Sequence, residues 1–110
     1  MSHNLPPIYL ATPCYNAAAT LGRTLESIVA QQGITLRYHV QDAASTDGSQ
    51  DVLAFFAARI AADPVRYGHI EFTWSSERDA GLYDGISRAF GCLNIPPDAL
   101  MGWLNADDTL

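Results

Sequence analysis

The sequence contains no lysine, and all six of its basic residues are arginine. Sites that depend on a lysine are therefore excluded from this segment, including the Walker lysine of a phosphate-binding loop and a Schiff-base lysine. Twelve acidic residues outnumber the basic ones, for a formal charge of -6. Because nucleic-acid backbones are bound through clustered positive charge, no nucleic-acid partner is expected. An acidic chain that handles phosphates needs a bound cation instead.

Cysteine is also scarce, with only Cys14 and Cys92, and no CxxC or Cys/His ligand spacing occurs. A zinc site is not expected, and two reduced thiols are a simpler interpretation than a disulfide. Residues 1–7 are polar and contain proline, unlike a signal peptide. The longest apolar stretch, residues 52–62, contains Arg59 and is too short to cross a bilayer. We expect a cytoplasmic segment, with membrane contact only through regions outside this sequence.

The 110 residues are 48% hydrophobic and 16% charged, which is typical of a globular chain with a core. Short apolar runs predict four strands at residues 8–12, 36–41, 70–74 and 100–104, the first of them ended by Pro13. Between them, apolar residues at helical spacing predict three helices, whose core-facing residues include Leu21, Leu25, Ile28, Leu53, Phe56, Ile60, Leu82, Ile86, Phe90 and Leu93. The alternation predicts an α/β fold, a Rossmann-like three-layer sandwich with a mostly parallel sheet and helices on both faces.

Polar residues follow each of the four predicted strands. In parallel sheets, ligands bind beyond the carboxyl ends of the strands. Asp107 and Asp108 follow the last strand, and two adjacent carboxylates repel each other unless a cation lies beside them. Magnesium or manganese fits, because either ion is held by one or two carboxylates together with water and substrate phosphates. The alternative for this pair is a solvated loop that caps a helix.

Asp42 ends the second strand, where its carboxylate can accept a hydrogen bond from a base or a sugar. Asp47 or Ser49 fits the N-cap of the following helix. Asp79 is open to two interpretations, a helix cap or a ligand contact, and Asp84 is placed to pair with Arg88 at i+4. The histidines, His3, His39 and His69, occur in unrelated contexts and are interpreted as structural.

Four segments, in order and over nearly the whole chain, resemble motifs of the family 2 glycosyltransferases of the GT-A fold. Residues 12–16 resemble the turn after the first strand, and residues 42–49 the Asp-x-x-Ser-Thr-Asp-Gly-Ser/Thr signature. Residues 76–84 resemble the Ser-Glu-x-Asp-x-Gly-Ile-Tyr-Asp segment of one branch, and residues 103–108 the Trp-Leu-Asn-x-Asp-Asp metal motif. The resemblance implies that residues 1–110 are the N-terminal nucleotide-sugar-binding part of a domain that continues beyond residue 110.

The resemblance also implies roles for individual residues. The expected nucleotide-binding set is Thr12, Pro13, Tyr15, Asp42, Asp79, Asp84 and Asp107, with Asp42 on the base and Asp107 on the ribose or sugar. Asp107 and Asp108 are expected to hold a divalent cation, manganese or magnesium, on the diphosphate. The chain departs from the family at Ala43-Ala44, where Asp-Gly or Gly-Gly is usual, at Asn105, where aspartate is frequent, and at Ser87, where asparagine is frequent.

The implied activity is that of a metal-dependent inverting glycosyltransferase that moves a sugar from a nucleotide diphosphate, expected to be a UDP-sugar, to a hydroxyl of a glycan or lipid-linked acceptor in polysaccharide synthesis. The general base of relatives lies well after the metal motif and is expected beyond Leu110. The alternative within this fold is a non-catalytic nucleotide-binding module. A phosphoacceptor signalling domain would need a late lysine, and a Rossmann oxidoreductase would need a glycine-rich first turn; both are missing here.

Overall fold

The computed structural model of the protein describes residues 6–79 and 81–108, without the side chains of Leu82 and Tyr83. The predictions for His3, for the side chain of Leu82 and for the chain beyond Leu110 lie outside the described residues. No helix in this part of the chain is long and apolar enough to span a membrane.

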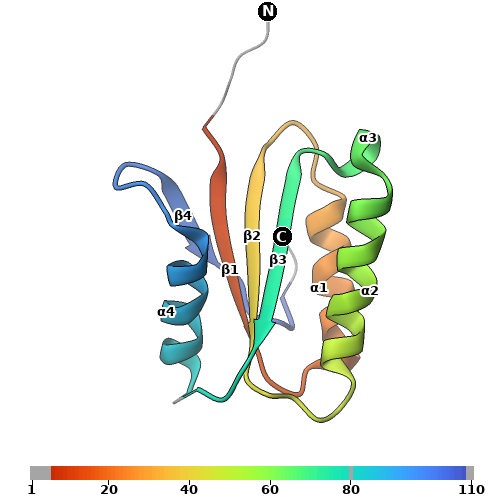
Figure 1. The fold of residues 1–110 in the computed structure, drawn as a ribbon, viewed down its shortest axis with the longest axis vertical. Coiled ribbons are helices and arrows are strands. Elements are labelled where there is room, and N and C mark those ends of the chain that lie inside the picture. The colour runs from red at the N-terminus through yellow and green to blue at the C-terminus, as the bar shows by residue number, and fades with distance from the viewer. Residues whose placement is uncertain (1–5, 80, 109–110) are drawn as a thin grey trace, which may run out of the picture.

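Four parallel strands form one sheet in the order β3-β2-β1-β4 (Figure 1). They are β1 (Ile8–Cys14), β2 (Leu36–Asp42), β3 (Ile70–Ser76) and β4 (Leu100–Trp103). Each pairs in parallel with its neighbour in the sheet. The four strands predicted from the apolar runs are confirmed, and all their carboxyl ends lie at one edge.

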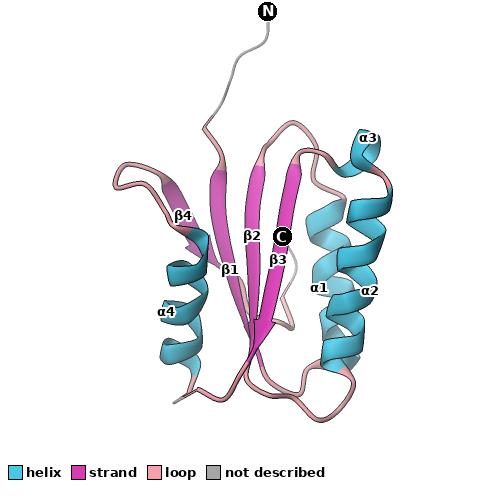
Figure 2. Ribbon diagram, viewed as in Figure 1, coloured by secondary structure: helices cyan, strands magenta, loops and turns pink. Residues whose placement is uncertain are grey.

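Helices cover both faces of this sheet, which confirms the predicted three-layer α/β fold (Figure 2). Helices α1 (Ala18–Val29) and α2 (Ser49–Ala62) pack together on one face. Helix α4 (Leu82–Leu93) crosses the other face over β1 and β2. Ile86 of α4 is buried, as the helical spacing predicted, whereas Phe90 and Leu93 are half-buried; Ala89, which was not predicted, is buried as well.

The two faces of the sheet differ in chemistry because side chains alternate along each strand. Toward α1 and α2 the sheet is apolar, and the core there includes Leu21, Leu25, Ile28, Leu36, Tyr38, Val40 and Leu53. The opposite face of β2 and β3 carries polar cross-strand pairs, Arg37 with Glu71, His39 with Thr73, and Gln41 with Ser75. One face therefore supplies most of the hydrophobic stability, and the other a polar layer close to the carboxyl edge.

Pro13 lies inside β1 and does not end it, so this sequence-based boundary was wrong. Main-chain groups of successive residues in a strand face opposite neighbours. The carbonyl of Cys14 accepts from Ala43 on the β2 side, whereas the carbonyl of Ala11 accepts from Leu104 on the β4 side. The nitrogen of Pro13 therefore faces the β4 side, beyond the end of β4 at Trp103. A missing N–H costs no ladder hydrogen bond there.

A one-turn helix, α3 (Pro64–Tyr67), was not predicted. Asp63 and Pro64 end α2 as expected, but they also start this turn, since Oδ1 of Asp63 accepts a hydrogen bond from the main-chain N–H of Arg66. Aspartate at the cap with proline at the first helical position is a strong helix start. The same dipeptide thus acts as a stop and as a start.

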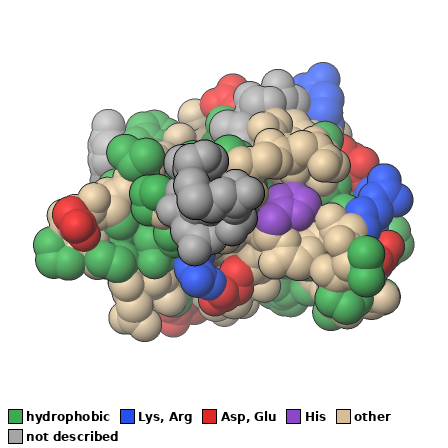
Figure 3. All heavy atoms as spheres, turned by 90° about the horizontal axis from the view of Figure 1, so that it is seen from above, with side chains coloured by type: hydrophobic (Ala, Val, Ile, Leu, Met, Phe, Trp, Pro, Cys, Tyr) green, Lys and Arg blue, Asp and Glu red, His purple; other side chains and the backbone are tan. Residues whose placement is uncertain are grey.

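β4 is a short edge strand with apolar side chains in solvent. Leu100 is 62% exposed, Met101 54% and Trp103 47%. Figure 3 looks onto the end of the molecule where the strands begin, and hydrophobic side chains gather there on the left, the side of β4 and α4 in Figure 1. Charged side chains are scattered over the same view. Packing alone therefore supports β4 less than the other three strands.

His39 gives the first testable prediction. Its buried ring has Nδ1 2.7 Å from Thr73 Oγ1 and Nε2 3.2 Å from Ser75 Oγ, and burial lowers the pKa of His39 below its usual 6.5. The unfolded chain therefore takes up a proton at a higher pH than the folded one, so stability falls as pH drops below about 6.5. In His39→Gln, we expect a smaller loss of melting temperature between pH 7.5 and pH 5.

The control is Ser75→Ala, which removes one hydrogen-bond partner of the ring but keeps the buried histidine, so the acid-side loss should persist. Equal slopes in the parent and in His39→Gln would contradict the assignment.

Candidate functional site

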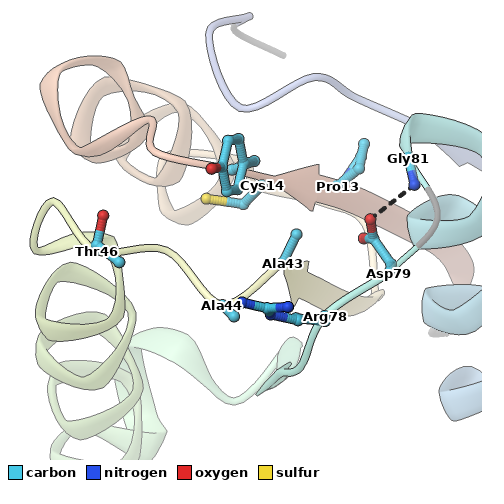
Figure 4. A pocket seen from close by; sticks show the side chains of 9 residues that line it. Pro13, Cys14, Ala43, Ala44, Thr46, Arg78, Asp79 and Gly81 are labelled. Atoms are coloured by element: carbon cyan, nitrogen blue, oxygen red, sulfur yellow. Dashed lines mark hydrogen bonds between the residues drawn. The ribbon is translucent and has the colours of Figure 1, made fainter.

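Three strands end level with one another, since Cys14, Asp42 and Ser76 are register partners across β1, β2 and β3. The loops that follow these strands lie next to one another at the carboxyl edge. Together they enclose a hollow of about 590 Å³. Its lining consists of Pro13, Cys14, Tyr15, Ala43, Ala44, Thr46, Arg78, Asp79 and Gly81 (Figure 4). The pocket lies where the strand order predicted a ligand.

Of the residues expected to bind a nucleotide, the structure places Pro13, Tyr15 and Asp79 in the lining of this pocket. Tyr15 is 67% exposed, so its ring is open to a ligand. Thr12 lies deeper and is fully buried, and its Oγ1 accepts a hydrogen bond of 2.7 Å from the hydroxyl of Tyr38. Thr12 therefore supports the pocket from within the core, and a direct contact to a ligand stays a prediction.

Asp42 lies beneath the pocket as a fully buried carboxylate. Its Oδ2 accepts hydrogen bonds from the main-chain N–H of Ser45, at 2.9 Å, and from Ser76 Oγ, at 2.7 Å. Its Oδ1 accepts from Ser45 Oγ at 2.5 Å. The carboxylate thus fixes the loop after β2 to the end of β3. Oδ2 already accepts two hydrogen bonds and the side chain has no exposed surface, so the expected contact with the base stays a prediction.

The loops after β1 and β2 are joined by reciprocal hydrogen bonds. Ser45 Oγ accepts from the main-chain N–H of Asn16 at 2.8 Å, and Asn16 Oδ1 accepts from the N–H of Thr46 at 2.8 Å. Asn16 adopts a positive φ of 46°, which asparagine tolerates better than most residues. These bonds hold the two walls of the pocket that carry Tyr15 and Thr46 in a fixed relation.

Asp47 serves the start of two helices. Its Oδ1 accepts from the main-chain N–H of Ser49 in α2, and its Oδ2 accepts from the N–H of Ala18 in α1. Hydrogen bonds from Ser49 and Ala18 lower the pKa of the Asp47 carboxyl. The N-cap position of α2 is Gly48, so the sequence-based choice between Asp47 and Ser49 was wrong about the position. The carboxylate still satisfies helix N–H groups, as a cap does.

Asp79 lines the pocket just before α4, and its Oδ1 accepts from the N–H of Gly81 at 2.9 Å. Its side chain lies against Gly85, where an added Cβ would be 2.9 Å from Oδ2 of Asp79 and 3.5 Å from Cβ of Pro13. Glycine at position 85 thus allows Asp79 and β1 to approach the helix closely. The sequence analysis did not identify Gly85, because this need appears only once α4 is packed on β1.

Arg78 lines the pocket but was not predicted from the sequence. Three other arginines pair with carboxylates: Arg37 with Glu71, Arg59 with Glu26, and Arg88 with both Asp84 and Glu77. Arg78 is exposed, lines the pocket and pairs with no carboxylate in the described part of the chain. It follows the third strand directly, which is the signal that could have identified it. Its guanidinium is available to a ligand anion.

Cys14 also lines the pocket and was not predicted to. Burial, with the nearby charge of Asp42, raises the pKa of the Cys14 thiol to about 12. The side chain is therefore a neutral thiol at physiological pH and acts as an apolar wall, since nucleophilic chemistry requires the thiolate.

Asp84 is held in the first turn of α4, with Oδ2 3.0 Å from Nε of Arg88, which confirms the predicted pair at i+4. It does not belong to the lining of the pocket, and its expected place at the border of a donor site stays a prediction. The Arg88 guanidinium also pairs with Glu77, at 2.9 Å, which ties α4 to the segment that carries Arg78 and Asp79.

Asp107 and Asp108 are exposed in the turn after β4, outside the lining of the pocket. The N–H of Asp108 donates to the carbonyl of Asn105 at 3.0 Å, which closes the turn. No group of three or more histidine, cysteine, aspartate or glutamate side chains in the described residues could hold a metal by itself. Two open carboxylates suit a hard cation whose other ligands are water and phosphate, so the donor set fits magnesium or manganese.

The sequence pattern of glycosyl transferase family 2 matches residues 9–110. This match spans all four strands and the whole carboxyl edge. The chain belongs to glycosyl transferase family 2. No curated protein sequence matches the chain.

Solved structures of glycosyltransferases share the fold of this family 2 chain. Residues 1–349 of S. aureus TarS, in complex with UDP-GlcNAc, match with a TM-score of 0.71 and 15% identity, over 94% of this chain and 27% of that one. The mannosyltransferase PcManGT from Pyrobaculum calidifontis, in complex with GDP-Man and Mn2+, matches with a TM-score of 0.74 and 22% identity, over 94% of this chain and 28% of PcManGT. These similarities confirm the GT-A type fold. The chain spans little more than a quarter of either structure.

Ala44 offers a test of strain in the pocket wall. Its φ is 56°, in the left-handed region, where an L-residue with a Cβ is disfavoured by about 1–2 kcal/mol. Glycine removes that cost but loses more backbone entropy on folding, about 0.5–1 kcal/mol. We expect Ala44→Gly to raise the free energy of unfolding in urea by about 0.5–1 kcal/mol.

Ala43→Gly is the matched control, because Ala43 has no positive φ. This variant should lose about 0.5–1 kcal/mol in its free energy of unfolding. If the two variants lose stability equally, Ala44 is not strained.

Gly85 and Gly91 allow a second comparison, since both lie inside α4. A Cβ at Gly91 meets nothing within 4 Å, so Gly91→Ala should gain about 0.5–1 kcal/mol from helix propensity. Gly85→Ala should fall short of that gain, because its Cβ displaces Asp79, and the amide resonance of Gly81 should shift in the NMR spectrum. An equal gain in both variants, with the Gly81 resonance unmoved, would contradict the close approach.

Proposed function

We propose that this family 2 chain is the nucleotide-sugar-binding part of a metal-dependent, inverting glycosyltransferase with a UDP-sugar donor. The observation that supports this most is the pocket at the carboxyl edge. Its lining joins the open ring of Tyr15, the carboxylate of Asp79 and the guanidinium of Arg78, which pairs with no carboxylate among the described residues. Two exposed carboxylates, Asp107 and Asp108, follow the neighbouring strand at the same edge. A nucleoside diphosphate with a cation requires these kinds of partner.

The pocket suits the nucleotide in size and in chemistry. Small-ligand sites commonly measure about 300–1,000 Å³, and this hollow measures about 590 Å³. The exposed ring of Tyr15 offers a face for stacking on a base. The guanidinium of Arg78 offers a planar set of donors that matches phosphate oxygens. Asp79, fixed by Gly81, offers an acceptor for a sugar hydroxyl.

Asp107 and Asp108 are proposed to hold a divalent cation against the diphosphate. Bound there, the ion would neutralise charge on the leaving diphosphate. PcManGT, a protein of the same fold, was solved with GDP-Man and Mn2+, which supports the use of such a cation among similar proteins. No residue of this chain is assigned as the general base, and we propose that the base lies beyond Leu110. A glycan or lipid-linked acceptor, a role in polysaccharide synthesis and a cytoplasmic location complete the proposal.

The test is a calorimetric titration of UDP into the protein, with and without manganese. We expect manganese to tighten UDP binding, and Asp108→Ala to abolish this tightening. Asp98→Ala is the matched control, since Asp98 is an exposed aspartate before β4, and it should bind as the parent protein does. A parallel titration of GDP tests the preference for uracil.

Two outcomes would contradict the proposal. One is a folded protein, by circular dichroism, that binds no nucleotide with manganese present. The other is UDP binding that manganese and Asp108→Ala both leave unchanged.

A further inference from the structure

Thr24 is a polar residue in the apolar face of α1. It is fully buried, and its helical neighbours Leu21, Leu25 and Ile28 belong to the core. Burying a hydroxyl without a hydrogen-bond partner costs about 1–3 kcal/mol, so Thr24 is tolerated at this position because its hydroxyl has partners. Thr24 Oγ1 lies 2.9 Å from the carbonyl oxygen of Ala106 and 2.6 Å from that of Asp108. Thr24 therefore reaches the turn that carries both exposed carboxylates, more than 80 residues along the chain.

Thr20, one helical turn earlier, reaches the same place. Its Oγ1 lies 3.1 Å from the carbonyl oxygen of Ala106 and 3.3 Å from that of Ala17. A hydroxyl carries one hydrogen and donates to one acceptor at a time. Thr20 can thus satisfy Ala106 while Thr24 donates to Asp108. The two threonines together give the turn a tether at each of these carbonyls.

The turn depends on such tethers because β4 supports it weakly. β4 is short, lies at the edge of the sheet, and exposes about half or more of Leu100, Met101 and Trp103. Beyond Trp103 its ladder continues through the N–H of Leu104, which donates to the carbonyl of Ala11. A carbonyl held by a helix fixes the peptide plane, and with it the direction in which the adjoining side chains leave the backbone.

We propose that Thr24, assisted by Thr20, is a positioning residue that sets the direction of the Asp107 and Asp108 carboxylates toward a cation-bound diphosphate. This inference rests on the proposed function, because it assigns those carboxylates to the cation. Groups that orient metal ligands typically contribute 10–100-fold to metal affinity. Thr24 contributes in this way through the main chain, without touching the cation itself.

The test compares Thr24→Val, which replaces the hydroxyl with a methyl group of similar size, with Thr24→Ser, which keeps the hydroxyl. UDP is titrated with and without manganese. In Thr24→Val we expect the manganese-dependent gain in UDP affinity to fall by about tenfold or more, with manganese-free binding unchanged. In Thr24→Ser the gain should return. A role in stability alone would weaken both kinds of binding together and would overturn the inference.

A second readout needs no ligand. The N–H of Asp108 donates to Asn105 within the turn, so its hydrogen exchange reports on the order of the turn. We expect exchange at Asp108 to be faster in Thr24→Val than in the parent protein or in Thr24→Ser. Unchanged exchange and an unchanged manganese gain in Thr24→Val would overturn the inference while leaving the proposed function intact. If Thr24→Val does not fold, Thr20→Val, at a half-buried position, carries both measurements.

The two proposals fail in different ways. If the parent protein binds UDP equally well with and without manganese, the cation assignment is refuted, and with it the role of Thr24 toward the cation. Faster exchange at Asp108 in Thr24→Val would then still identify the tether as a structural one.

Discussion

The carboxyl edge of the sheet depends on one buried charge, the carboxylate of Asp42. A carboxylate without solvent is tolerated only where hydrogen bonds replace its hydration. Ser45 and Ser76 supply those bonds, so the loop after β2 and the end of β3 must stand within reach of Asp42. The hydroxyl of Ser45 then accepts from the N–H of Asn16, which passes the same constraint to the loop after β1. The three walls of the pocket are thus placed by a single requirement, the solvation of Asp42 by the protein.

Helix α1 connects this arrangement to the turn after β4. The helix has no side-chain cap of its own, and its first N–H groups are satisfied by Asp47 and Ser49 from the loop after β2. One and two turns further, Thr20 and Thr24 hold the turn of Asp107 and Asp108. Asp107 and Asp108 do not line the pocket, yet the pocket loops and the turn of these two carboxylates are both bonded to the first half of α1. This explains how a pocket and a separate pair of carboxylates can keep a constant relation for one ligand.

Local patterns were enough to predict the four strands, the three longer helices and the α/β fold, because apolar periodicity is set by the sheet and the core. The resemblance to family 2 motifs added Pro13, Tyr15 and Asp79, which the structure places in the lining of the pocket. What the local patterns missed depends on packing between distant segments. Thr24 looks like one more residue of an apolar helix face until the turn after β4 is placed against α1, and Gly85 matters because Asp79 lies against it. Pro13 was misplaced as a strand end because its missing N–H matters only where a neighbouring strand needs a donor. The sequence around Pro13 does not show which neighbour its nitrogen faces.

The charges around the pocket favour the proposed function only if a cation takes part. Arg78 is the one cation among the described residues that line the pocket. It stands against the carboxylates of Asp79 in the lining and of Asp107 and Asp108 beside it, in a chain of net charge -6. A diphosphate brings further negative charge, and each close pair of like charges costs about 1–4 kcal/mol at the dielectric constants of water and of protein surfaces. One guanidinium does not offset that repulsion. In the proposed function, a divalent cation held by Asp107 and Asp108 would convert this repulsion into attraction. The two carboxylates would then favour binding only when the metal and the nucleotide arrive together. Nucleotide affinity and metal affinity should therefore rise jointly, as thermodynamic linkage requires of two ligands that share one site.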